Sequence, residues 1–164
     1  MGLVHDRSPA YRMAERLATA EKTTLIFLRR YSPTFMRWAI GLVFVWFGAL
    51  KLAQVSPAAG LVAETLRFLP ISPSFTVAAL GVFEAAAGIA LIANLLPRTV
   101  LAAILLHLLG TLFALISQPA SVFQHGNPFL LTIEGEFIVK NAVLVAGALV
   151  VASSLPPRSS DGGS

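Results

Sequence analysis

The sequence predicts an all-α integral membrane protein, a bundle of four transmembrane helices with an N-terminal amphipathic helix. Three observations lead to this fold class. The 164 residues are 56% hydrophobic and only 12% charged, whereas soluble domains usually carry about 25% charged residues. The apolar residues gather into four long runs, and a helix needs about 20 residues to cross a bilayer. Prolines stand between the runs, where they end helices and favour turns.

Four segments have the length and composition of a membrane span. They cover about residues 36–53, 75–93, 99–116 and 137–153. A short hairpin joins the second and third segments. The first and last connections are longer, and the first is expected to hold a short surface helix near residues 58–68.

We expect one membrane domain, residues 35–154, between two segments of different composition. Residues 1–34 are basic and are expected to lie in the cytoplasm. Residues 155–164 are rich in Ser, Gly and Pro, which predicts a disordered cytoplasmic tail. The N-terminus is not expected to be a cleaved signal peptide, because its early apolar run, Leu25–Leu28, is too short.

Within the basic segment, Met13, Leu17 and Ala20 recur at helical spacing. This spacing predicts an amphipathic surface helix over about residues 9–30. A disordered basic tail is the alternative.

The distribution of Lys and Arg predicts the orientation, because cytoplasmic loops carry an excess of these residues. Nine of the 12 lie on the side of the N-terminus: Arg7, Arg12, Arg16, Lys22, Arg29, Arg30, Arg37, Arg98 and Arg158. The other three, Lys51, Arg67 and Lys140, lie on the opposite side. With four spans, the bias predicts a multi-pass protein with both termini in the cytoplasm.

Composition and motifs exclude several functions. With no cysteine, the chain has no disulfide and no thiolate metal site, and we expect no metal. The residues that give its net charge of +4 flank the spans, and no fold or motif for nucleic-acid binding is present. No nucleic-acid partner is therefore expected. No nucleotide-binding, serine-hydrolase or metalloprotease motif is present, which favours a protein that is not itself an enzyme.

Besides Arg37 at the cytoplasmic end of the first span, four ionisable residues fall inside the predicted spans, where such groups are costly and avoid lipid. They form a predicted intramembrane polar cluster with one adjacent amide: Lys51, Glu84, His107, Lys140 and Asn141. Each ionisable residue lies on a stripe of small residues, which let membrane helices approach closely. The helix-packing glycines of these stripes are Gly41, Gly48, Gly81, Gly88, Gly110 and Gly147. All four ionisable side chains are therefore expected to face the interior.

Glu84 is expected to pair with either Lys51 or Lys140. It lies about 14 Å below the outer surface at 1.5 Å per residue, and both lysines lie higher in the same half. A structural ion pair that fixes packing is as plausible as a functional group. For His107, a neutral hydrogen-bonded histidine is favoured over a metal or haem ligand, since one histidine supplies one ligand.

Three segments resemble the DoxX-like superfamily of small four-helix bacterial membrane proteins. They are GLVFVWFGALK at residues 41–51, GVFEAAAG at 81–88 and EGEFIVKNAVLVAGALV at 134–150. The chain is most similar to the RclC/YkgB-like branch, which includes a protein of reactive-chlorine resistance. The resemblance implies a four-helix plasma-membrane fold. Some members are described as subunits of quinone-linked oxidoreductases and others as oxidative-stress proteins.

The leading hypothesis is an accessory, non-catalytic subunit linked to membrane redox or oxidative stress, with a quinone or lipid pocket at Glu84, His107 and Lys140. Quinone is the one cofactor that the resemblance suggests. The expected partners are the lipid bilayer and either a membrane oxidoreductase or further copies of the chain. A small proton-coupled transporter is one alternative, since buried Glu and His can relay protons. A structural scaffold for a membrane complex is the other.

Overall fold

A computed structural model describes residues 9–57, 59–68 and 70–157. Of the terminal segments expected at residues 1–34 and 155–164, residues 1–8 and 158–164 lie outside the described residues. The regular elements of the described part are helices: α1 (Pro9–Leu52), α2 (Ala59–Thr65), α3 (Pro73–Ile92), α4 (Pro97–Ser117), α5 (Pro119–Val122), the 3₁₀ helix η1 (Gln124–Gly126) and α6 (Ile133–Ser153). Four of them, α1, α3, α4 and α6, are long and apolar enough to cross a membrane. The predicted all-α, four-span fold is confirmed.

Helix α1 includes both the expected amphipathic segment and the expected first span. It runs without interruption from Pro9 to Leu52 with Pro33 inside it, so the two are one helix and not two. The chain nevertheless divides into compact units between Phe35 and Met36. In the first unit, threonine hydroxyls bond to the carbonyl four residues earlier, as Thr23 does with Thr19. The amphipathic role of this unit stays a prediction.

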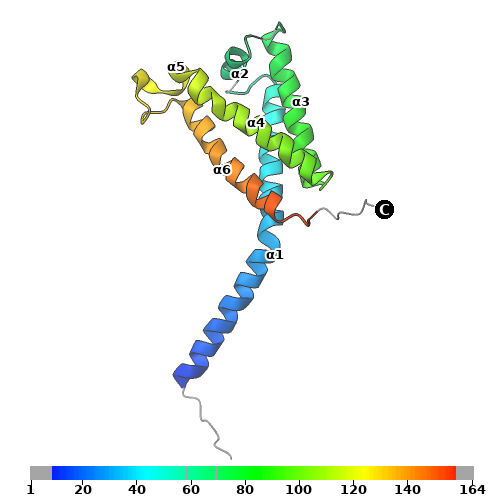
Figure 1. Ribbon diagram of the computed structural model, residues 1–164, viewed down its shortest axis with the longest axis vertical. Helices are drawn as coiled ribbons and strands as arrows, with labels where there is room; N and C mark the ends of the chain where they lie inside the picture. Colours follow the sequence, from blue (N-terminus) through cyan, green and yellow to red (C-terminus); the bar gives the residue numbers. More distant parts are fainter. Residues whose placement is uncertain (1–8, 58, 69, 158–164) are drawn as a thin grey trace, which may run out of the picture. The chain divides into compact units, whose positions relative to one another are not determined.

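In the second unit, which begins at Met36, the spans alternate in direction (Figure 1). Helices α2 and α5 lie at one end of the bundle, here named the α2/α5 end. The turn from α3 to α4 lies at the other end. In this turn Asn94 and Leu96 adopt left-handed backbone angles, with φ of 58° and 42°. Pro97 follows as the first residue of α4, where its missing N–H needs no partner.

Helix α6 begins four residues before the expected start, at Ile133 rather than residue 137. The reason is a helix cap. The Thr132 side chain accepts a hydrogen bond from the Gly135 backbone N–H at 3.1 Å, which satisfies one of the free donors of the first turn. Glu134 and Glu136 then lie in that first turn, where carboxylates favour the positive end of the helix dipole.

Helices α1 and α3 touch through two pairs of glycines. A Cβ atom on Gly48 would lie 2.6 Å from the carbonyl oxygen of Gly81, and one on Gly88 would lie 2.5 Å from that of Gly41. The glycines repeat every seven residues on both helices, and the helices run antiparallel, so the pairs match at two levels. Backbone meets backbone at both levels, which leaves no room for a methyl group. These four positions therefore pack as the sequence predicted.

The remaining predicted packing glycines behave differently. A Cβ on Gly147 would lie 2.9 Å from Sδ of Met36, so this glycine does lie at a contact between α6 and α1. Gly110 is exposed, and a Cβ there would meet nothing within 4 Å. The prediction for Gly110 is wrong because α4 packs through Ile104 and Leu108, and Gly110 lies about 120° round the helix from Ile104.

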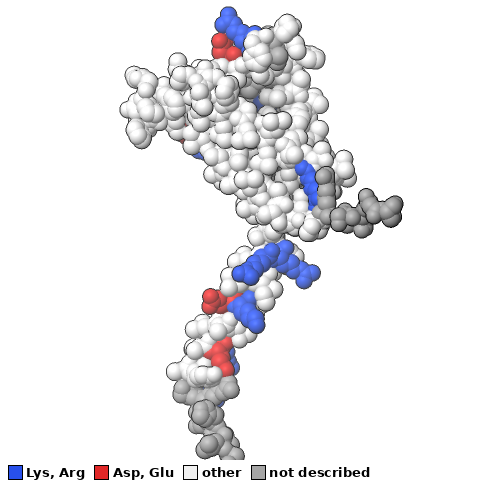
Figure 2. Space-filling model, viewed as in Figure 1, with Lys and Arg blue, Asp and Glu red and all other residues white. Residues whose placement is uncertain are grey.

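The bundle has an apolar core and an apolar exterior. The main core cluster joins α1, α3, α4 and α6 through the buried residues Ile40, Phe44, Ala87, Leu91, Leu101, Ile104, Leu108, Ala148 and Val151. A smaller cluster, Ala114, Val122 and Ile138, lies where α5 meets α4 and α6. Figure 2 shows that the surface over α3, α4 and α6 in this view is almost free of charged side chains. An exterior of this kind suits lipid rather than water.

Candidate functional site

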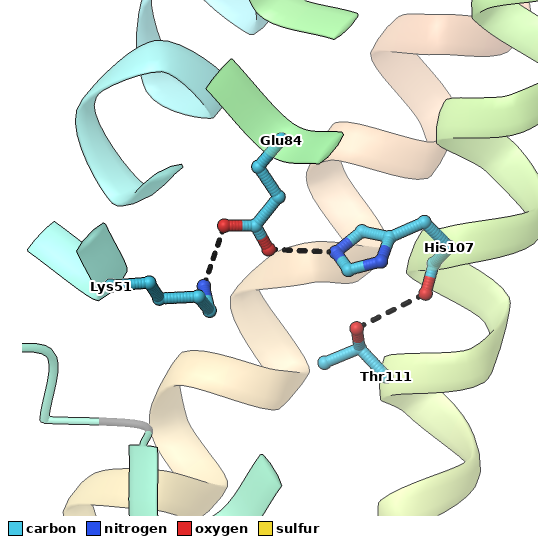
Figure 3. A network of polar contacts seen from close by, with 4 residues as sticks. All are labelled: Lys51, Glu84, His107 and Thr111. Carbon is cyan, nitrogen blue, oxygen red and sulfur yellow. Dashed lines mark hydrogen bonds and ion pairs between the residues drawn. The ribbon is translucent and has the colours of Figure 1, made fainter. Parts of the chain in front are cut away.

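The Glu84 carboxylate lies between two basic side chains in the interior of the bundle (Figure 3). Glu84 is on α3 and only 5% exposed. Its Oε2 accepts a hydrogen bond from Lys51 Nζ at 2.6 Å, and its Oε1 lies 2.9 Å from His107 Nε2. Each carboxylate oxygen therefore has a partner from a different helix, Lys51 from α1 and His107 from α4.

The close contact of α1 and α3 explains why Lys51 reaches Glu84. The two helices are antiparallel and touch at Gly48 and Gly81. Lys51 lies about one turn after Gly48, and Glu84 lies about one turn after Gly81. Because the helices run in opposite directions, the two residues are roughly 9 Å apart along the axis. The lysine stem must run back over Gly81 to reach the carboxylate. A Cβ on Gly81 would lie 2.9 Å from the Lys51 Cβ, so this glycine provides the path for the lysine.

Lys140 does not take part in this contact. Its Nζ donates to Glu136 Oε2, one turn away on the same helix, at 3.0 Å, and its side chain is 71% exposed. The expectation that all four ionisable residues face the interior is therefore wrong for Lys140. The next residue, Asn141, does face the interior cavity described below, because one residue turns the helix by about 100°.

His107 is held by aromatic rings and by its hydrogen bond. Its ring packs edge-on against Phe44, with centroids 5.7 Å apart, and lies 5.5 Å from Phe83. An ionised carboxylate only accepts hydrogen bonds, so Nε2 carries the proton in this contact. Thr111 donates its hydroxyl to the His107 carbonyl at 3.1 Å. The two ring contacts and the contact with Glu84 thus orient the imidazole, whereas the Thr111 hydrogen bond reaches only the backbone.

The charges of the cluster compensate each other. One ammonium group and one carboxylate lie in direct contact, with side-chain exposures of 6% and 7%. A buried charge is tolerated only when it is paired and hydrogen-bonded. Both conditions hold for Lys51 and Glu84, and the ammonium group of Lys51 keeps donors beyond the one that it gives to Glu84.

A cavity of about 110 Å³ lies against this cluster. Its polar lining comes from six residues: Lys51, Glu84, His107, Thr111, Glu134 and Asn141. The remainder is apolar and largely aromatic or aliphatic, with Phe44, Phe47 and Phe137 among the lining residues. The wall is built by α1, α3, α4, α6 and the α2 segment. Apolar walls with a few convergent polar groups are typical of small-molecule sites.

Metal binding has no support among the described side chains. No three His, Cys, Asp or Glu residues of residues 9–57, 59–68 and 70–157 lie together in a way that could hold a metal ion. His107 contacts a carboxylate rather than a second histidine. Within the described part, the site is thus a compensated polar cluster beside an apolar cavity.

The sequence analysis found four of the six polar residues of this site, Lys51, Glu84, His107 and Asn141, but missed Thr111 and much of the wall. Phe47, Phe137 and Glu134 were not among the predicted site residues. A signal for them does exist: Phe44, Phe47 and Lys51 recur at helical spacing, and Phe137 lies one turn before Asn141. These spacings place the aromatic and polar residues on the same helix faces.

Comparison with known families gives one match. The DoxX family model matches residues 32–117, just over half of the chain. No curated protein and no solved structure matches. The matched range holds Lys51, Glu84 and His107, together with the glycine pairs of α1 and α3, whereas Lys140 and Asn141 on α6 lie beyond it. It does not distinguish the RclC/YkgB-like branch, which stays a prediction. With four apolar helices and this match, the chain is a multi-pass membrane protein that belongs to the DoxX family.

Proposed function

We propose that the protein is an accessory subunit of a membrane redox system and holds the ring of a quinone in the cavity beside Glu84. The observation that carries the proposal is the lining of this cavity, where Lys51, His107 and Asn141 meet aromatic side chains. A quinone ring has an apolar face and carbonyl oxygens that accept hydrogen bonds. Quinone would supply reversible electron transfer, and the chain would supply binding and orientation.

The cavity suits a ring in its chemistry and is close to one in size. An engineered apolar cavity of about 150 Å³ binds benzene, so a volume of about 110 Å³ suits a small ring group with modest adjustment. It is well below the roughly 300–1,000 Å³ of sites that enclose drug-sized ligands. Lys51 has three N–H donors and gives one to Glu84. The Asn141 amide adds further donors.

An accessory role suits the state of the polar residues better than a catalytic one. Both oxygens of Glu84 are engaged, with Lys51 and with His107. A carboxylate held in this way positions its neighbours and is poorly placed to attack a substrate. The membrane is proposed to be the bacterial plasma membrane, with both termini in the cytoplasm, because the Lys/Arg bias favours that orientation.

Quinone binding tests the proposal directly. Protein extracted in mild detergent would be examined by native mass spectrometry for a retained quinone and then titrated with short-tailed ubiquinone. Asn141→Leu removes a donor and fills part of the cavity, so affinity should fall about five-fold or more. Lys140→Leu is the matched control, because this neighbouring side chain lies outside the cavity lining and should leave affinity unchanged. A native protein that binds no quinone, or equal losses in both variants, would refute the proposal.

Proton-coupled transport is the second candidate, favoured by the 2.9 Å contact between Glu84 and His107. A carboxylate and an imidazole in contact inside a membrane can pass a proton. Proton flux into liposomes that disappears with Glu84→Gln would support transport over redox. A structural scaffold remains the third candidate, and tolerance of substitutions at Lys51, Glu84 and His107 within a stable larger complex would favour it.

A further inference from the structure

Two aromatic side chains form the wall of the cavity between α1 and α6. Phe47 of α1 and Phe137 of α6 both line the cavity. Their rings meet edge to face, with centroids 6.2 Å apart and planes at 81°. Phe137 is also 38% exposed, and Phe47 is half-buried. At this level, therefore, the two side chains reach from the cavity toward the exterior of the bundle.

A lysine accompanies each of the two rings. Lys51 Nζ lies 6.0 Å from the centroid of Phe47, and Lys140 Nζ lies 5.9 Å from that of Phe137. Lys51 is buried and pairs with Glu84, whereas Lys140 is exposed and pairs with Glu136. The aromatic pair thus has one polar group on its cavity side and another on its outer side.

The level of the aromatic pair places it within the membrane. Phe137 lies four residues after the first residue of α6 and Phe47 five before the last of α1, roughly 6 Å and 7.5 Å along the helix axes. Both helices are long enough to cross the hydrocarbon region. An exposed apolar side chain at this depth contacts lipid near the membrane surface, and the long side chain of Lys140 reaches from the same level toward the headgroups. A molecule that passes between the two rings would therefore come from the bilayer and not from water.

The cavity is also too small for a ligand with a long tail. About 110 Å³ holds a ring, so a tail attached to that ring has to leave the cavity. An exit between Phe47 and Phe137 would place the tail among lipid chains, where its burial costs nothing. Exposed aromatic side chains change rotamer quickly compared with movements of whole helices. The rings could therefore part without a rearrangement of α1 or α6.

We propose that the ligand is a lipid-soluble molecule with a ring-shaped polar head and a long apolar tail, and that it reaches the cavity from the bilayer between Phe47 and Phe137. The inference rests on the proposed quinone function and adds the class of quinone, the long-tailed one, and its route.

A cross-link across the passage tests the route. The chain has no cysteine, so Phe47→Cys with Phe137→Cys introduces the only two thiols. A short, reducible, bifunctional thiol reagent would join them. In nanodiscs, exchange of bound long-tailed ubiquinone should slow at least ten-fold after cross-linking and recover on reduction. The two single-cysteine variants, treated with the same reagent, are the controls and should exchange at the rate of the untreated protein.

A second variant keeps the test independent of the cross-link. Phe47→Ala with Phe137→Ala removes both rings and should speed association and release of long-tailed ubiquinone several-fold. Unchanged exchange in the cross-linked protein, or a failure of the short reagent to join the two positions, would overturn the route. If neither long-tailed ubiquinone nor its tail-less ring binds the native protein, the proposed function itself fails. Binding of the ring together with unrestricted exchange contradicts the route alone.

Discussion

Among single residues, Glu84 should contribute most to stability, because its removal leaves the buried ammonium group of Lys51 without a counter-ion. We expect Glu84→Gln to lower the free energy of unfolding by about 3–5 kcal/mol. The double variant Glu84→Gln with Lys51→Met should regain most of this loss, since it removes the uncompensated charge. Unfolding in mixed detergent–SDS micelles, followed by circular dichroism, measures both values.

The pair Glu136–Lys140 supplies the matched control at the same scale. It has the same chemistry and a similar distance, 3.0 Å, but both side chains are more than half exposed. Glu136→Gln and Lys140→Met should each change the free energy of unfolding by no more than about 1 kcal/mol. Equal losses at the two pairs would show that burial does not distinguish them, and the account of Glu84 would be wrong.

Sequence spacing alone was sufficient to place Glu84, Lys51 and His107 on inward-facing stripes. It was not sufficient to choose between Lys51 and Lys140 as the partner of Glu84. The choice depends on rotation and depth: α6 turns Lys140 outward and Asn141 inward, while the stem of Lys51 passes over Gly81. Neither the rotation of a packed helix nor its register against its neighbour can be read from one helix by itself.

At the scale of the elements, the contact between α1 and α3 should depend on glycine. A Cβ on Gly48 would lie 2.6 Å from the Ala85 backbone nitrogen, and a backbone cannot move aside as a flexible side chain can. Gly48→Ala should therefore separate the helices and lower the free energy of unfolding by about 1–3 kcal/mol. The same variant should weaken the Lys51–Glu84 contact. If it does, the losses of thermal stability in detergent caused by Gly48→Ala and by Glu84→Gln should not add up in the double variant.

Gly110→Ala is the control for this prediction. It makes the same chemical change inside a membrane helix, but a Cβ at this position meets nothing within 4 Å. The expected change is within about 0.5 kcal/mol. A large loss with Gly110→Ala, or none with Gly48→Ala, would contradict the packing described for α1 and α3.

The elements themselves were largely predictable, with informative exceptions. Apolar length placed four spans, and proline placed their connections. Hydropathy alone put the start of the last helix near residue 137, because Glu134 and Glu136 look unlike membrane residues. The Thr132 cap, a local hydrogen bond, extends α6 back to Ile133. The stripe of small residues on α4 gave a wrong prediction for Gly110 for a different reason. Small residues lie at a helix contact only where another helix approaches them.

For the whole molecule, the Lys/Arg bias predicts which end of the bundle faces the cytoplasm. Single cysteines introduced into this cysteine-free chain can report the orientation. Leu95→Cys lies in the turn between α3 and α4, where Leu95 is 59% exposed, and Phe129→Cys lies at the α2/α5 end, where Phe129 is 91% exposed. A membrane-impermeant maleimide should label Phe129→Cys in intact bacterial cells and Leu95→Cys only after permeabilisation. The reverse pattern would refute the orientation, and the unmodified chain should show no labelling.

The sequence by itself determined that this chain spans a membrane four times, which residues carry charge within the spans, and where most of its close helix contacts lie. These properties follow from local composition and from the fixed period of the helix, so one chain segment suffices to state them. The tertiary structure decided which lysine meets Glu84, which glycines lie at contacts, and that Phe47 and Phe137 line a cavity. Each of these depends on how two helices are rotated and shifted against each other, a relation set by the packing of the whole bundle.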